Sequence, residues 1–151
     1  MCSIIIEEIK RELKKVRLCR HQMIIVVGGQ RSRVIEQFAY EVGIKPINLN
    51  LCLSKLLLDL PLNRRSRKVG ELVNRLVIEC GDVVLLEHFE LLFLPELQVD
   101  PMRLFEDVSR DKVLVIGWSG QYENGALIYA YSGHPEYRIY NEIEASIIQT
   151  D

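Results

Sequence analysis

Two spacings of apolar residues alternate along the chain, and they predict helices and strands in turn. Apolar residues that recur every three or four positions indicate amphipathic helices, whereas unbroken runs of aliphatic, largely β-branched residues indicate strands buried on both faces. Helices are expected at residues 5–16, 34–42, 51–60 and 69–80, and from Asp100 and Pro101 to about residue 110. Strands are expected at residues 23–27, 46–50, 83–86 and 113–117. A hairpin is expected from residues 126–131 and 136–140, and a last strand at 145–149.

Strands that alternate with helices need crossover connections. The expected fold is therefore α/β, with three layers in which a mostly parallel sheet has helices on both faces. We expect the strand at 23–27 at the centre of the sheet and the strand at 83–86 beside it, because both are wholly apolar. No linker or repeat interrupts the sequence. Residues 1–151 are expected to form a single domain, with an N-terminal helix in 1–20, a core in 23–120 and C-terminal strands in 124–151.

The composition limits which partners the protein can attract and in which cellular compartment we expect it. Of 151 residues, 48% are hydrophobic and 26% are charged, which suits a globular domain with a core of its own. The formal net charge of −2 gives no overall attraction to nucleic acid or to a membrane. The four cysteines lack metal-binding spacings, which favours free thiols in a reducing cytosol. No apolar stretch approaches the roughly 18 residues of a membrane span, so we expect a cytoplasmic protein without membrane contact.

A glycine turn joins the strand at 23–27 to the next helix, and it is the first candidate site. Ligands of parallel sheets bind beyond the carboxyl ends of the strands. Glycines there let backbone N–H groups surround an anion at a helix N-terminus, where Arg31 would supply a cation and Ser32 a ligand for Mg²⁺. The candidate residues for binding ATP or ADP are Gly28, Gly29, Gln30, Arg31 and Ser32. The full signature G-x-x-x-x-G-K-[ST] is missing, so the alternatives are a shortened phosphate loop and a plain glycine turn.

Acidic residues after the strand at 83–86 predict a metal site beside this turn. Glu87 directly follows the apolar run, as does the acid that helps to hold Mg²⁺ in P-loop NTPases. Glu87 and Ser32 are the candidate metal ligands, and Glu87 and Glu90 are the candidate catalytic carboxylates. Ser119, after the fourth strand, is a candidate sensor of the γ-phosphate. With the glycine turn, these residues predict a P-loop NTPase-like domain; the plainer interpretations are a solvated acid and an ordinary strand-end turn.

A basic segment between two predicted helices is the candidate contact with nucleic acid or with a partner protein. Its cations are Arg64, Arg65, Arg67 and Lys68, and we expect them on a loop that projects from the domain. Such a loop can meet DNA phosphates or an acidic partner, and the plainer interpretation is a solvated basic surface. The lack of interleaved aromatic residues disfavours stacking on a single strand. We favour the partner protein over DNA because the net charge is negative.

The order of these motifs resembles the BrxF family, the small P-loop-containing proteins of type 3 BREX phage-defence systems. The resemblance covers nearly the whole chain, and the order and spacing of its segments carry it together. The segments are Pro46-Ile47-Asn48-Leu49, Val83-Val84-Leu85-Leu86-Glu87 continuing into Glu90-Leu91-Leu92-Phe93, Asp100-Pro101, and Gly133-His134-Pro135-Glu136-Tyr137.

The resemblance implies a P-loop NTPase fold and service beside a large ATPase, a methyltransferase and an alkaline-phosphatase-like protein in a bacterial defence island. The family's usual loop lysine is missing and Glu87 replaces an Asp, so we expect binding of ATP or ADP with Mg²⁺ but slow or absent hydrolysis. The first hypothesis is a nucleotide-responsive accessory subunit that acts through its partners, foremost the large ATPase, or through a second copy of itself. The alternatives are a structural adaptor without nucleotide binding and a DNA-contacting subunit that uses the basic segment.

Overall fold

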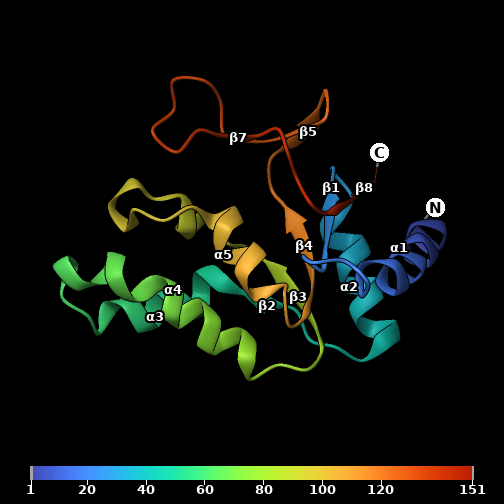
Figure 1. Ribbon diagram of the computed structural model, residues 1–151, viewed down its shortest axis with the longest axis horizontal. Coiled ribbons are helices and arrows are strands. Elements are labelled where there is room, and N and C mark those ends of the chain that lie inside the picture. The colour runs from blue at the N-terminus through green and yellow to red at the C-terminus, as the bar shows by residue number, and fades with distance from the viewer. Residues whose placement is uncertain (1, 151) are drawn as a thin grey trace.

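A five-stranded parallel sheet forms the centre of the molecule, with helices over both of its faces (Figure 1). The computed structural model describes residues 2–150. The strands are β1 (Met23–Val27), β2 (Ile47–Asn48), β3 (Val83–Glu87), β4 (Val113–Trp118) and β8 (Ser146–Gln149). Their order across the sheet is β2-β3-β4-β1-β8, and each neighbouring pair is parallel. The expected α/β class with a mostly parallel sheet is confirmed.

The position of β4 corrects the expected strand order. β1 and β3 are both interior strands, but they are not neighbours, because β4 lies between them and pairs with each. All six residues of β4 are buried, as are all five of β1. An apolar run marks a strand as covered on both faces and does not specify its neighbours. The hydrophobic pattern therefore could not distinguish the two orders.

Alternate side chains of the strands pack into two cores, one on each face of the sheet. Met23 and Ile25 face the helices α3, α4 and α5, whereas Ile24 and Val26 face α1 and α2. The helices are α1 (Cys2–Val16), α2 (Arg31–Val42), α3 (Leu49–Leu58), α4 (Leu62–Ile78) and α5 (Pro101–Val108). Figure 1 shows α3 and α4 across the sheet from α1 and α2. None of the helices within residues 2–150 combines the length and the apolar character needed to cross a membrane.

The basic segment lies in a helix, and the expected projecting loop is wrong. α4 begins at Leu62, directly after Pro61, so its first turns contain the cations. They are Arg64, Arg65, Arg67 and Lys68. Proline cannot continue the preceding helix, while arginine and lysine favour helical backbone. Only residues 59–61 separate α3 from α4, and the cations therefore sit on a rigid helical surface.

A second, antiparallel sheet lies beyond the carboxyl ends of the parallel strands. It consists of β5 (Gln121–Glu123), β6 (Ala126–Tyr129) and β7 (Arg138–Tyr140), in the order β5-β6-β7. The pairing of β6 with β7 confirms the expected hairpin, and β5 was not expected. Trp118, buried at the end of β4, donates from Nε1 to the carbonyl of Ile128 at 3.1 Å and contacts the rings of Tyr129 and Tyr140. It fastens the small sheet to the large one.

Candidate functional site

The carboxyl ends of β1, β4 and β3 bring the glycine turn and Glu87 to one edge of the sheet. Val27 pairs with Trp118, and Leu86 pairs with Ile116, so the residues that follow these strands emerge side by side. Adjacent strands are about 4.8 Å apart, which puts β1 and β3 about 10 Å from each other across β4. Side chains from the two ends can meet over β4 at this spacing.

The glycine turn is tight. β1 ends at Val27 and α2 begins at Arg31, so only residues 28–30 connect them. Gly28 has φ 126°, a conformation that favours glycine. The backbone N–H of Arg31 donates to the Gly28 carbonyl at 3.2 Å, and its guanidinium Nη1 donates to the same oxygen at 3.2 Å. The Arg31 cation is therefore held against the turn rather than extended from it.

Ser32 and Glu87, the two candidate metal ligands, meet at this edge. The Ser32 hydroxyl, in the first turn of α2, lies close enough to the Glu87 carboxylate at the end of β3 to favour its charged form. Burial raises the pKa of Glu87, and the nearby Ser32 hydroxyl and the charges of His88 and Arg31 offset part of that rise. Burial disfavours the charged form of the Glu87 carboxylate. A cation beside the carboxylate would offset this cost, because an opposite charge favours the charged form.

Gly117 leaves the space that Glu87 occupies. A Cβ at this position of β4 would lie 2.8 Å from Cδ1 of Ile35 and 3.4 Å from Cγ and Oε1 of Glu87. Any side chain there would push Ile35 of α2 or displace the carboxylate. The absence of a side chain at Gly117 therefore lets α2 and the end of β3 approach each other over β4.

Thr150 supplies a contact to the turn that the sequence did not reveal. The Gln30 N–H donates to Oγ1 of Thr150 at 3.2 Å, and the Thr150 N–H donates to the Val27 carbonyl at 2.9 Å. Thr150 is buried. β8 pairs in parallel with β1, and Gln149 lies opposite Val27. Thr150, the residue after Gln149, is therefore carried to the turn. A hydroxyl of the chain thus occupies one of the N–H groups that a phosphate would bind.

Ser119, the candidate sensor, directly follows β4, which is the neighbour of β1 in the sheet. Its Oγ is buried and finds no partner within residues 2–150. Residues 120–123, which follow Ser119, line a cavity of about 230 Å³ together with Gly28 and Gln149. This space beside the turn is small for a nucleotide, because pockets for small molecules usually measure about 300–1,000 Å³.

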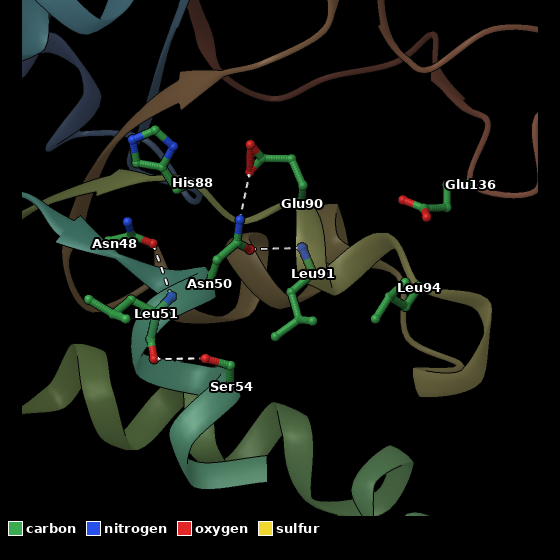
Figure 2. Close-up of a pocket in the computed structure, with 9 residues that line it drawn as sticks. All are labelled: Asn48, Asn50, Leu51, Ser54, His88, Glu90, Leu91, Leu94 and Glu136. Atoms are coloured by element: carbon green, nitrogen blue, oxygen red, sulfur yellow. Dashed lines mark hydrogen bonds between the residues drawn. The ribbon is translucent and has the colours of Figure 1, made fainter. Parts of the chain in front are cut away.

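Glu90, the second candidate carboxylate, lies in a different cavity. That cavity measures about 630 Å³, and neither Ser32 nor Glu87 lines it. Its lining is formed by Asn48, Asn50, Leu51, Ser54, His88, Glu90, Leu91, Leu94 and Glu136 (Figure 2). Glu90 begins the 3₁₀ helix η1 (Glu90–Phe93), which a second one, η2 (Pro95–Leu97), follows. The structure therefore groups Glu87 with Ser32 and separates Glu90 from both.

Asn50 holds the segment between Glu87 and Leu91, and sequence reasoning missed it. Its N–H donates to the His88 carbonyl at 2.6 Å. Its Oδ1 accepts from Leu91 N–H at 2.8 Å, and its Nδ2 donates to Glu90 Oε2 at 3.3 Å (Figure 2). His88 has φ 52°, which a non-glycine residue adopts only when its surroundings hold it there. Asn50 thus fixes the backbone that leaves Glu87 facing Ser32 and turns Glu90 to the other side. The short motif around Asn48 was the only signal for this role.

The basic residues of α4 lie apart from the glycine turn and differ among themselves. Arg65 is half-buried and donates from Nε to the Leu60 carbonyl at 3.1 Å. Lys68 pairs with Glu71 at 3.4 Å, which neutralises part of the patch. Arg64 and Arg67 are exposed. This surface is a short mixed-charge helix face rather than a concentrated basic loop.

The site is built from a hydroxyl and a carboxylate rather than from a metal-binding cluster. Among residues 2–150 no group of three or more His, Cys, Asp or Glu side chains is placed to hold a metal ion. A single hydroxyl and a single carboxylate suit Mg²⁺, which keeps several waters and takes other ligands from phosphates. The fold and the site together define an α/β protein with a candidate anion site at the carboxyl edge of a parallel sheet. No protein-family model, curated protein or solved structure matches the chain.

Proposed function

We propose that the protein binds ATP or ADP with Mg²⁺ at the glycine turn and hydrolyses it slowly or not at all. The approach of Ser32, at the start of α2, to Glu87, at the end of β3, is the observation that carries this proposal. P-loop NTPases hold Mg²⁺ with a Ser or Thr of the phosphate loop and an acid at the end of another strand. The two residues that the sequence predicts for these two roles lie near each other, although they are far apart in the chain.

Each residue has a defined part in such a site. Backbone N–H groups at the start of α2 would bind phosphate oxygens, favoured by the helix dipole, and Arg31 would add positive charge. Ser32 and Glu87 would hold Mg²⁺, which when bound neutralises phosphate charge. The Gln30 N–H becomes free for a phosphate only when the Thr150 hydroxyl leaves it, so binding would rearrange the residues after β8.

Slow turnover follows from the groups around the turn. The chain has no lysine at the turn, and the Arg31 guanidinium is directed to the Gly28 carbonyl. Stabilisation of transferred phosphoryl charge is usually the main source of rate in this chemistry. Glu90, the other carboxylate considered for activating water, lines a cavity that excludes Glu87 and Ser32. Binding is thus favoured over catalysis.

The cellular role that we propose is an accessory subunit of a BREX phage-defence system in the cytoplasm. The order of motifs along the sequence supports this role, with the large ATPase of such a system as the principal partner. In this role partner proteins would sense whether ATP or ADP is bound at residues 28–32. The segment from Glu87 to Glu90 would carry that change to the partner surface. Glu87, which lies near Ser32, is three residues before Glu90 in the chain.

A structural adaptor without nucleotide binding is the second candidate. Two observations favour it: the Thr150 hydroxyl occupies the Gln30 N–H, and the cavity beside the turn measures only about 230 Å³. In that case the contact between Ser32 and Glu87 would serve to join α2 to β3. The two candidates differ in one measurable property, the affinity for nucleotide.

A titration with a fluorescent ATP analogue, with and without Mg²⁺, tests the proposal. We expect Mg²⁺-dependent binding that Ser32→Ala and Glu87→Gln each weaken by roughly tenfold or more, about 1.4 kcal/mol. Thr150→Val should tighten binding, because it frees the Gln30 N–H at little cost in volume. Ser3→Ala, at an exposed serine of α1, is the matched control and should leave the affinity unchanged.

Two outcomes would count against the proposal. No binding at about 1 mM nucleotide, a free energy of about −4 kcal/mol, would favour the adaptor. Hydrolysis at about 1 per second or faster, lost in Glu87→Gln, would show an ordinary enzyme instead of a slow one.

A further inference from the structure

An apolar helix on the outside of the molecule leaves leucine side chains without cover. α3 is rich in leucine, and it buries Leu49, Leu53 and Leu57 in the core. Its neighbours on the outer side remain in solvent: Leu51 is 54% exposed, Leu58 74%, and Leu62 at the start of α4 78%. A helix that is apolar around most of its circumference is normally covered on more than one side. Exposed apolar side chains that gather in one place mark interaction surfaces.

These leucines border a groove. A cavity of about 440 Å³ lies between the α3–α4 connection and the 3₁₀ helices η1 and η2. Leu58, Leu62, Leu91 and Leu94 are among its lining residues. It shares Ser54, Leu91 and Leu94 with the cavity of about 630 Å³ that contains Glu90, so the two cavities adjoin, and we call the pair the groove. Figure 2 shows Leu94 and Leu91 on η1 and its continuation, between Ser54 of α3 and Glu136.

The two halves of the groove differ in charge. The larger half contains the carboxylates of Glu90 and Glu136, which come from η1 and from the segment before β7, and no lysine or arginine lines it. The smaller half is mainly leucine, with Arg65 and Glu96 as its charged residues. An occupant would therefore place apolar side chains in one half and a cation in the other. The same carboxylates would repel the phosphates of a nucleic acid.

The described helices other than α3 have much of their apolar surface in the two cores. α1 buries Ile5, Ile6 and Ile9, and the apolar faces of α2, α4 and α5 are likewise buried there. The exposed leucines of a second copy's α3 come with the same two carboxylates, Glu90 and Glu136. Charge complementarity therefore favours an occupant from another protein that carries a cation beside its apolar face.

We propose that this groove binds an amphipathic helix of a partner protein, with leucine-type side chains over α3 and a lysine or arginine at the end that meets Glu90 and Glu136. Helices commonly bind grooves through anchors at positions i, i+3 or i+4, and i+7. The apolar half supplies most of the affinity, and the carboxylates fix the direction of the helix. The proposal goes beyond nucleotide binding and does not depend on it, since neither Ser32 nor Glu87 lines the groove.

Selection from a displayed library of helical peptides tests this proposal on the full chain. We expect enriched peptides to carry large aliphatic residues at helical spacing and a lysine or arginine beyond one end. A synthetic peptide of the enriched sequence should lose at least about tenfold in affinity for Leu58→Ser/Leu62→Ser, since apolar anchors dominate such interfaces. Both leucines are exposed, so this variant should keep the fold, as circular dichroism can verify.

Charge and position controls complete the experiment. Glu136→Lys should weaken binding of the cationic peptide and improve binding of a peptide whose cation is replaced by glutamate. Leu18→Ser, at a leucine that is 91% exposed and outside the groove, should leave the affinity unchanged. No enrichment, enriched peptides that bind Leu58→Ser/Leu62→Ser as well as the original protein, or indifference to Glu136→Lys would each overturn the proposal. So would a stable dimer that Leu58→Ser/Leu62→Ser dissociates.

Discussion

Trp118 stands between two glycines, Gly117 and Gly120, where an added side chain would press on neighbouring atoms. Gly117 makes room for Ile35 and Glu87, as described above, and Gly120 makes room for the β6 backbone. A Cβ at Gly120 would overlap the Ile128 carbonyl, the same oxygen that accepts from Trp118 Nε1, and would lie 2.8 Å from that nitrogen. Small residues here serve the junction between the two sheets. The segment that suggested a phosphate sensor is thus first of all a structural joint.

Replacing Gly120 tests this joint at the scale of one residue. We expect Gly120→Ala to lower the free energy of unfolding by about 3 kcal/mol or more, because the clash is with backbone that cannot move aside. Gly81→Ala is the matched control: an added Cβ there meets nothing within 4 Å, and the change should stay within about 0.5 kcal/mol. Urea unfolding of both variants measures the difference. Equal stabilities would show that β6 is free to shift away from Gly120.

At the scale of elements, one aspartate joins α5 to the small sheet. Asp100 Oδ1 caps α5 by accepting from Met102 N–H at 3.1 Å, and it also accepts from the Tyr140 hydroxyl of β7 at 2.7 Å. The expected helix start at Asp100 and Pro101 is confirmed. Burial and the hydrogen bond to Asp100 raise the pKa of Tyr140, and burial raises the pKa of Tyr129 from about 10 to about 12. Both phenols are therefore protonated more firmly in the folded chain than in the unfolded one.

These tyrosines predict a loss of stability at high pH. A group whose pKa is raised by folding contributes its full stabilisation below the unfolded value, near pH 10, and loses it as the pH rises through the folded value. Tyr140→Phe should make the decline above pH 10 shallower, and at neutral pH it should cost about 1 kcal/mol for the lost hydrogen bond. Unfolding followed by circular dichroism across this range measures both effects. Tyr40→Phe, at a tyrosine 89% exposed on α2, should change neither; a decline that is unaltered in Tyr140→Phe would contradict the assignment.

At the scale of the whole molecule, charge favours protein partners over DNA. The net charge is −2, and the cations of α4 share their helix face with Glu71, which pairs with Lys68 at 3.4 Å and with Arg75 at 3.6 Å. Cations at a helix N-terminus also oppose the helix dipole, so an acidic partner that covers Arg64 and Arg67 would relieve that cost. A surface of this kind suits an acidic protein better than a continuous phosphate backbone.

Replacing the exposed cations distinguishes these partners. In Arg64→Gln/Arg67→Gln, which keeps a helix-compatible side chain, we expect DNA retention by the isolated protein to be unchanged. If the proposed BREX role holds, co-purification with the large ATPase of that system should fall. Lys14→Gln/Lys15→Gln on α1 is the control of equal charge and should leave co-purification intact. Tight DNA binding whose salt dependence drops by roughly one unit for each cation removed would instead identify DNA as the ligand.

The sequence by itself determined the class of the fold and predicted two residues of the candidate site. Periodicity located β1, β3 and β4 and the main helices, because burial on one or two faces leaves a direct record in the spacing of apolar side chains. Ser32 and Glu87 were predicted because a residue after a strand must lie at the carboxyl edge of a parallel sheet. The prediction of a loop at the basic segment is wrong, since charge alone does not separate a loop from a solvent-facing helix.

Only the tertiary structure decided how these parts combine. It placed β4 between β1 and β3, brought Thr150 to the Gln30 N–H, and used Asn50 to turn Glu90 away from Glu87. It also left the leucines of α3 uncovered beside two carboxylates. Each of these depends on which strand pairs with which, or on a side chain that reaches a backbone group far away in the chain. Such contacts leave no periodic pattern in the sequence, because each is formed by a single polar side chain. Other Asn and Thr residues of the chain look the same in the sequence, so nothing marks the one that makes the contact.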